Sequence, residues 1–435
     1  MRSIVAAVLS TFGLALVLTS CGDLLGSGGA GGPPGLLSVA PASGETAFSV
    51  LDPIVLRFTR TVDPAAVAET VSLWNGGRRV VVVPSLGSKD NAVILRPADP
   101  LDFGTDYRVV VSEAVMFRGG SALPQEESWE FRTEGLPPPI PNQDSLLVHL
   151  EALAHDSMRG RGSGSVDELR AAEYLRDRFM AYGLQEAPGG VIQAFEAYSA
   201  RLERDLTSQN VLAAVEGSGA LAQEWVVVGA HYDHIGFRNL ENEDDGPNNG
   251  ADDNGSGTVL VLETARAYKN YVEAGGMGSR DRRSVLFAAF GAEEQGLLGS
   301  CSYVHGNPAV PLGLTRAMMN FDMVGRLRSN TVYISGAETS GVWNSLVTNS
   351  NEPALSLAIR ESSCTGCTDH VCFWQAGIPF VGFFTGLHNE YHGPDDDVGL
   401  IDFSGMRRIG ELALRVLNRV VVMPAGPQLT GTYPG

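Results

Sequence analysis

Four continuous apolar runs stand out in the second half of the chain, and each leads into a segment that contains His, Asp or Glu. With their polar ends, the runs cover residues 225–233, 285–294, 317–322 and 378–392. Apolar runs of this length, bounded by glycine or polar residues, are typical of strands that are buried on both faces of a parallel sheet. Since ligands of open α/β sheets bind beyond the carboxyl ends of the strands, the pattern predicts a site at that edge.

The pattern is different between residues 36 and 135, where apolar residues come in short alternating stretches. Strands are expected at residues 54–59, 80–83, 92–96, 107–112 and 129–133. Several short strands at this spacing indicate an all-β sandwich. The segment also resembles bacterial Ig-like domains in its stretches "VAPASGE", "LDPIVLRFTRTVDPAAV" and "WEFRT". We expect it to serve as a spacer or a weak adhesion module.

A proline-rich stretch at residues 136–143 predicts an extended linker. Beyond it, strand and helix patterns alternate over residues 144–424, and a short tail follows at residues 425–435. One of the helices opens with a capping box that runs from Ser165 to Glu168. The predicted fold class is therefore α/β, with a mixed and mostly parallel sheet flanked by helices and an all-β sandwich before it.

The first residues have the features of an export signal. Residues 1–20 combine a basic start with a short apolar core, and Cys21 follows "LTS" in a way that resembles the lipobox of bacterial lipoproteins. The resemblance implies a cleaved signal peptide, a lipid-modified Cys21 and a flexible tether at residues 21–35. The protein would then be exported and anchored by lipid to the bacterial cell envelope. The alternative is an ordinary secretory signal in which Cys21 stands by chance.

Composition and cysteine content narrow the functional classes. The chain of 435 residues has 44% hydrophobic residues and a formal net charge of -19, which argues against a nucleic-acid partner, because such a partner needs a basic face. Four cysteines remain beyond Cys21: Cys301, Cys364, Cys367 and Cys372. In an oxidising compartment three disulfide pairings are open to them, and Cys364 with Cys367 could close a small loop. A zinc ion on the four thiolates is the rival interpretation.

The residue types at the predicted sheet edge are those that bind metal ions. His231 and Asp233 lie two apart on one strand, so the carboxylate can orient the ring of a metal-binding histidine. Glu293 and Glu294 point in different directions, so one can bind metal while the other acts as a base. The other candidates are Asp322, His392 and, from a loop, either Asp252 or Asp253, for which a turn role is the alternative.

The motifs "GAHYDHIG", "NNGADDNGSG", "FAAFGAEEQGLLGS", "MNFDMVGRL" and "FFTGLHNEYHGPDD" together resemble those of the bacterial zinc aminopeptidases, which are dizinc exopeptidases. The resemblance covers residues 145–422 and implies two Zn²⁺ ions, in sites that cobalt or manganese can also fill. It implies the following roles: His231 and Asp322 on one ion, Glu294 and His392 on the other, Asp253 as the bridge, Glu293 as the general base and Tyr391 as the oxyanion donor.

Three further features have no role in the metal sites that the resemblance implies. His370 stands in Thr368-Asp369-His370, where the family often has Ser-Asp-His near the substrate; a structural histidine is the equal alternative. Arg326 is a cation without an assigned role that could serve a carboxypeptidase. The aspartates at residues 395–397 are expected in a solvated turn.

The resemblance implies an aminopeptidase that hydrolyses N-terminal residues from peptides, with a water molecule activated by metal and a glutamate base. A carboxypeptidase, an amidohydrolase and a glutaminyl cyclase on the same fold are alternatives. An inert binding protein at the cell surface is a further one. The expected partners are a peptide substrate and, through the lipid anchor, a membrane.

Overall fold

The computed structural model describes residues 34–431 and 433, apart from residues 46–47, 51, 64–66, 68, 88–90, 99–100, 238–245, 279, 352–354 and 363–365. The expected signal peptide, Cys21 and Cys364 lie outside the described residues. In the part that is described, no helix has the length and apolar character needed to cross a membrane.

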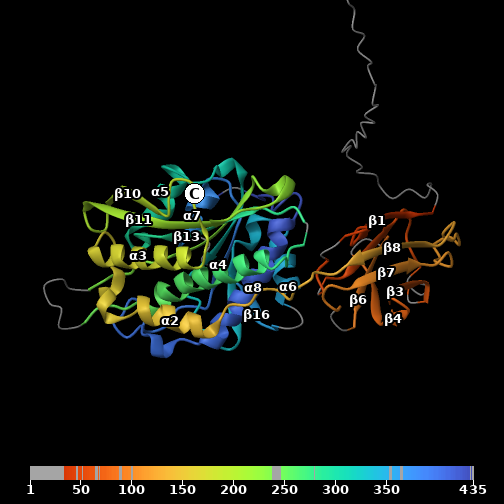
Figure 1. Cartoon of the computed structure of the whole chain (residues 1–435), viewed down its shortest axis with the longest axis horizontal. Coiled ribbons are helices and arrows are strands. Elements are labelled where there is room, and N and C mark those ends of the chain that lie inside the picture. The colour runs from red at the N-terminus through yellow and green to blue at the C-terminus, as the bar shows by residue number, and fades with distance from the viewer. Residues whose placement is uncertain are drawn as a thin grey trace, which may run out of the picture.

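The N-terminal domain is a sandwich of two four-stranded antiparallel sheets, shown in red and orange in Figure 1. One sheet has the order β1 (Leu36–Ala40), β2 (Ile54–Phe58), β6 (Ala92–Pro97) and β5 (Val82–Leu86). The other has the order β4 (Arg78–Val80), β3 (Val71–Asn75), β7 (Asp106–Val111) and β8 (Glu127–Arg132). The prediction of a single strand at residues 80–83 is wrong. Two strands of different sheets, β4 and β5, meet there, and the chain passes from one sheet to the other at the exposed Val81.

The larger domain is built on a mixed sheet, which has nine strands among the described residues. Its order is β10 (Ile192–Ser199), β11 (Arg204–Val215), β13 (Ser284–Phe290), β12 (Trp225–His231), β14 (Thr315–Phe321), β17 (Phe380–Phe384), β15 (Thr331–Ser335) and β16 (Ala358–Glu361), and β9 (Gln185–Glu186) pairs with β11. The four central strands, β13, β12, β14 and β17, are parallel, and antiparallel strands extend the sheet on both sides. The α/β prediction is therefore confirmed, with the apolar runs at the centre.

Helices cover both faces of this sheet, as Figure 1 shows. One face carries α2 (Gln143–Leu153), α3 (Val166–Ala181), α4 (Gly257–Glu273), α6 (Trp343–Asn351) and α8 (Phe403–Val422), and the other carries α5 (Leu298–His305) and α7 (His370–Gln375). Every residue of β13 is buried as a result. Burial from both sides explains why the central strands are mostly apolar and do not alternate.

The capping box of α3 also connects this helix to the edge of the sheet. Ser165 Oγ accepts hydrogen bonds from the N–H groups of Asp167 and Glu168, as predicted for the N-cap. The Glu168 carboxylate does not close the box on Ser165; it accepts from Gly164 N at 2.7 Å and from Ala292 N at 3.0 Å. Because Ala292 directly precedes Glu293, the cap of α3 fixes the strand end that carries the two adjacent glutamates.

The two domains touch through a small set of polar contacts. Asp52 of the sandwich pairs with Arg419 of α8. Glu134, which follows β8 and is buried, accepts from Val50 N at 3.1 Å and lies 3.4 Å from the hydroxyl of Tyr271 on α4. The sandwich is thus tied to the helical face that lies away from α5 and α7.

Candidate metal centre

The carboxyl ends of the four parallel strands meet at one pocket of about 280 Å³. His231 is the last residue of β12, the pair Glu293 and Glu294 forms a turn after β13, and Asp322 follows β14. His392 enters from the loop after β17. The pocket therefore brings together the predicted residues His231, Asp253, Glu293, Glu294, Asp322, His370, Tyr391 and His392.

Asp253 reaches this pocket from the turn Ala251–Ser256, which lies between β12 and α4. Gly250, with a φ of 55°, opens the turn, and a Cβ atom at that position would collide with the backbone oxygen of Asp253. The two carboxylate oxygens of Asp253 face different histidines: Oδ1 is 3.5 Å from His231 Nε2 and Oδ2 is 3.0 Å from His392 Nε2. The neighbouring Asp252 points away and accepts from Gly325 N at 2.7 Å.

Two groups of donors can be distinguished around Asp253. In the first half-site, His231 Nε2 lies 3.5 Å from Asp253 Oδ1 and 3.6 Å from Asp322 Oδ1. In the second half-site, His392 Nε2 lies 3.0 Å from Asp253 Oδ2 and 3.2 Å from Glu294 Oε1. Tetrahedral zinc with bonds of about 2.0–2.1 Å holds its ligand atoms about 3.4 Å apart, so both groups fit this ion in spacing and in donor type.

The electrostatics of the second half-site also favour a cation. Against the opposing effect of burial, Asp253 and Glu294 raise the pKa of His392 to about 9. Burial raises the pKa of Glu294, but the hydrogen bonds from His234 and His392 outweigh it and hold that pKa well below its ordinary range. The carboxylates therefore draw positive charge to the point between them, where a metal ion would supply it.

Glu293 occupies the position expected of a base. Its Oε2 atom lies 3.9 Å from His231 Nε2, next to the first half-site, and burial raises the pKa of its carboxyl well above the ordinary value. A carboxylate of this kind accepts a proton more readily than a solvated one. Tyr391 lines the same pocket, and its ring is stacked on that of His392. Burial, and next the negative charge of Asp253, raises the pKa of the Tyr391 hydroxyl, so the hydroxyl keeps its proton and can donate it in a hydrogen bond.

The role expected for Asp233 needs correction. Its Oδ1 atom lies 3.7 Å from His231 Nδ1, too far for a hydrogen bond, while its backbone oxygen lies 3.2 Å from that atom. The carboxylate is instead engaged by other donors: Glu293 N at 2.9 Å, Glu294 N at 3.3 Å and Ser163 Oγ at 2.6 Å. Asp233 therefore positions the backbone of the glutamate pair, and its own main chain orients the histidine ring.

Two further sequence expectations, about Arg326 and about the aspartates at residues 395–397, are also corrected. Arg326 is not among the residues that line the pocket; it pairs with Asp396 at 2.8 Å and with Glu390 at 3.5 Å. Asp395 and Asp397 are exposed, as expected for a solvated turn, but Asp396 between them is fully buried. It accepts from the N–H groups of Asp252 and Asp253 at 2.9 and 3.0 Å, which supports the turn that carries Asp253. His370 lines the pocket and stacks on Phe380, with ring centroids 4.0 Å apart.

Sequence reasoning missed two buried residues beneath this pocket. The guanidinium of Arg161 is fully buried and donates to the backbone oxygens of Leu153, Tyr232, Asn249 and Gly250 at 2.7–3.0 Å. Burial lowers its pKa to about 10, so it stays charged at neutral pH. His234 lies beside the second half-site, and its position three residues after His231 was the signal that could have identified it.

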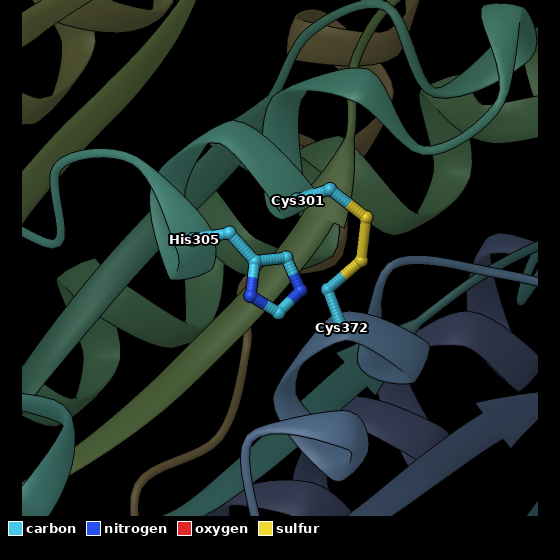
Figure 2. Close-up of side chains that lie close together, drawn as sticks. All are labelled: Cys301, His305 and Cys372. Atoms are coloured by element: carbon cyan, nitrogen blue, oxygen red, sulfur yellow. A yellow bond between two sulfur atoms is a disulfide. The ribbon is translucent and has the colours of Figure 1, made fainter.

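A disulfide joins the two helices on the pocket side of the sheet. Cys301 of α5 is bonded to Cys372 of α7, with Cα atoms 5.2 Å apart, which excludes a zinc ion on the four thiolates. Figure 2 shows His305 with its ring beside this bond. Because joined sulfur atoms are not thiolates, these three residues form no metal site. Cys367 is also disulfide-bonded, and its expected partner, Cys364, lies outside the described residues.

Comparisons with known proteins agree with this architecture. Residues 30–133 match the family described as bacterial Ig-like domain, and residues 210–417 match peptidase family M28. Aminopeptidase YwaD of Bacillus subtilis (strain 168) is 30% identical over 233 residues, which are 51% of this chain and 47% of the relative. The chain thus spans about half the length of the relatives it matches.

Solved structures of the same fold include BSAP, a zinc aminopeptidase from Bacillus subtilis, with a TM-score of 0.53 and 18% identity over 66% of this chain and 97% of that one. The glutaminyl cyclase of Porphyromonas gingivalis has a TM-score of 0.52 and 21% identity over 65% of this chain and 100% of that one. At these identities the two structures establish the fold alone. The two family matches identify a peptidase family M28 domain behind a bacterial Ig-like domain in this chain.

Proposed function

We propose that the pocket is the catalytic centre of a metal-dependent aminopeptidase. The observation that carries the proposal is the charge of its lining: carboxylates surround it, and none of its described lining residues is Arg or Lys. The free α-amine of a peptide would be attracted to such a pocket, whereas an α-carboxylate would be repelled. The relatives named as aminopeptidases support the same activity.

Two divalent ions, one in each half-site, would polarise the scissile carbonyl and lower the pKa of the attacking water. Glu293 accepts a proton from that water as its oxygen bonds to the carbonyl carbon, and then passes the proton to the leaving nitrogen as the C–N bond breaks. The hydroxyl of Tyr391 donates to the oxygen that becomes negative in the transition state. The Asp233 carboxylate keeps Glu293 in place, because it accepts a hydrogen bond from the main-chain N–H group of Glu293.

The apolar part of the pocket indicates the preferred N-terminal residue. Met323, Phe383, Phe384 and Leu387 line the same pocket as the carboxylates. A side chain bound against this wall gains about 25 cal/mol for each Å² of apolar surface removed from water. We therefore propose that large apolar N-terminal residues, such as leucine, are cleaved faster than acidic ones, which the carboxylates repel.

The test compares Glu293→Gln with Glu151→Gln, a matched change at an exposed position of α2 that does not line the pocket. With leucine p-nitroanilide, the first variant should lose about 10²–10⁴-fold in kcat and still bind its metal ions, since the amide removes only the proton acceptor. The second should behave like the wild type. Normal turnover by Glu293→Gln would refute the base assignment.

Blocked substrates separate the remaining alternatives. An aminopeptidase should cleave leucine p-nitroanilide and leave the N-acetylated compound intact, while a carboxypeptidase or an amidohydrolase should accept peptides with a blocked amine. A glutaminyl cyclase should convert N-terminal glutamine to pyroglutamate. An inert binding protein should show none of these reactions, and metal analysis of the purified protein should then find about zero zinc ions in place of the two expected.

We also propose that the protein is exported and held at the envelope by lipid on Cys21. The Cys301–Cys372 disulfide supports export, because such bonds persist in oxidising compartments. Labelled fatty acid should appear in the wild type and be absent from Cys21→Ser, and that variant should move from the membrane fraction to the soluble one. Label retained by Cys21→Ser would contradict the proposal.

A further inference from the structure

His234 is a fully buried imidazole at the edge of the second half-site. It follows β12 by three residues, and its backbone is held on both sides of the turn: its N–H donates to Arg161 O at 3.2 Å, and it forms a bridge with Gly162. The ring is therefore fixed by the same segment that fixes the buried arginine. A buried imidazole in so rigid a position needs a polar partner to offset the loss of water.

The partner of His234 is the group of atoms assigned to the second half-site. Its Nδ1 atom lies 3.0 Å from Glu294 Oε1 and 3.8 Å from Asp253 Oδ2, and these two distances bracket the separation of about 3.4 Å expected between ligands of tetrahedral zinc. His392 Nε2 faces the same two oxygens at 3.2 and 3.0 Å. The rings of the two histidines are inclined by 66°, so they approach the oxygens from different directions.

The Oδ2 atom of Asp253 adds a second observation. It is buried, and although His392 Nε2 lies 3.0 Å away, their alignment does not make a hydrogen bond. His234 Nδ1 and Glu294 Oε1 lie within hydrogen-bond distance of each other, but the buried Asp253 Oδ2 has no such partner. An unpaired carboxylate oxygen at this spacing from nitrogen atoms has the arrangement of a ligand around an ion. Four ligand-type atoms converge here, from Asp253, Glu294, His392 and His234.

We propose that His234 is a fourth protein ligand of the second half-site and binds its ion through Nδ1, an inference that rests on the proposed two-metal function. The second half-site is then closed, as in structural zinc sites, and the first, with His231, Asp253 and Asp322, keeps a position open. Glu293 lies beside that first group. The two half-sites therefore have unequal tasks: the first provides the position for reaction, and the second holds its ion and the bridging carboxylate in place.

X-ray absorption of the zinc-loaded protein tests the proposal without measuring activity. With His231, His392 and His234 as ligands, two zinc ions share three imidazoles, an average of about 1.5 per ion. His234→Ala should lower this average to about 1.0 when both sites are kept filled by excess zinc. An average of about 1.0 in the wild type with two zinc ions bound overturns the proposal. A wild type that binds fewer than two ions contradicts the proposed function instead.

Competition with a chelator gives the second readout. Loss of a ligand should weaken binding of one of the two zinc ions by at least about 10-fold, the lower bound seen even when outer hydrogen-bond partners are removed. His234→Asn places an amide near the Nδ1 position, where it can still donate to Glu294 but binds zinc poorly. It should therefore be as weak as His234→Ala if His234 is a ligand. Full recovery of affinity in His234→Asn would show that His234 only donates a hydrogen bond.

His305→Ala is the matched control, because it removes an exposed imidazole on α5 that belongs to neither half-site. It should leave zinc affinity and the imidazole average unchanged. Circular dichroism of each variant with zinc removed establishes that the domain is folded before affinities are compared. If His234→Ala fails to fold, His234→Asn still separates the two roles, since it retains both size and polarity.

Discussion

Removal of the Cys301–Cys372 disulfide should cost the larger domain much of its stability. The bond closes a loop with a sequence separation of 71 residues, and the loop-entropy relation for such a loop gives about 4 kcal/mol at 25 °C. A domain of roughly 280 residues, from Gln143 to Val422, has a large unfolding entropy, so this loss corresponds to a fall in Tm of about 7 °C.

Calorimetry of Cys301→Ser/Cys372→Ser beside the wild type checks this value. Ser302→Ala, the next position on α5, controls for changes in the helix itself and should stay within about 0.5 kcal/mol of the wild type. A double variant that loses less than about 1 kcal/mol would refute the reasoning. It would mean that packing between α5 and α7 holds these helices together as well as the covalent bond does.

Two further changes give distinct results. Tyr391→Phe should reduce kcat for leucine p-nitroanilide by about 10²-fold with little change in KM, since it removes only a donor to the transition state. A rise in KM as large as the fall in kcat would contradict that role. Burial raises the pKa of Glu134 at the domain junction, so its contribution to stability is complete below its ordinary value of about 4.5 and is lost as pH rises through the raised pKa. Glu134→Gln should lack this decline when urea unfolding is measured between about pH 4 and 8, and parallel curves for the two proteins would exclude the effect.

The sheet and its functional edge could be predicted because the central strands are buried on both faces. Continuous apolar runs such as those of β12 and β13 predict buried parallel strands. The ends of these strands then place His231 and Glu294 at the same edge of the sheet. Asp253 is different, since turn chemistry alone explained it as well, and only the resemblance to a known family separated it from Asp252.

Residues that act across long sequence separations could not be predicted. Asp396 lies 144 residues from Asp252, and nothing near it in sequence indicates that its carboxylate supports that turn. Arg326 had no assigned role in the sequence for the same reason: its partner in the fold, Asp396, is distant along the chain. The spacing of apolar residues along a helix or strand predicts which of its faces is buried. It gives no such information for these loops, which bury one another.

The position of Arg161 has a consequence for how the backbone around the pocket keeps its shape. Its guanidinium donates to the backbone oxygens of Tyr232, just after β12, and of Asn249 and Gly250, which precede the turn that carries Asp253. A cation that belongs to the chain thus assembles the backbone of the cavity and partly neutralises its acids. Small zinc domains fold only when the ion arrives. If this pocket binds metal ions as proposed, the backbone around it would not depend on them for its shape, because a cation of the chain itself already holds it.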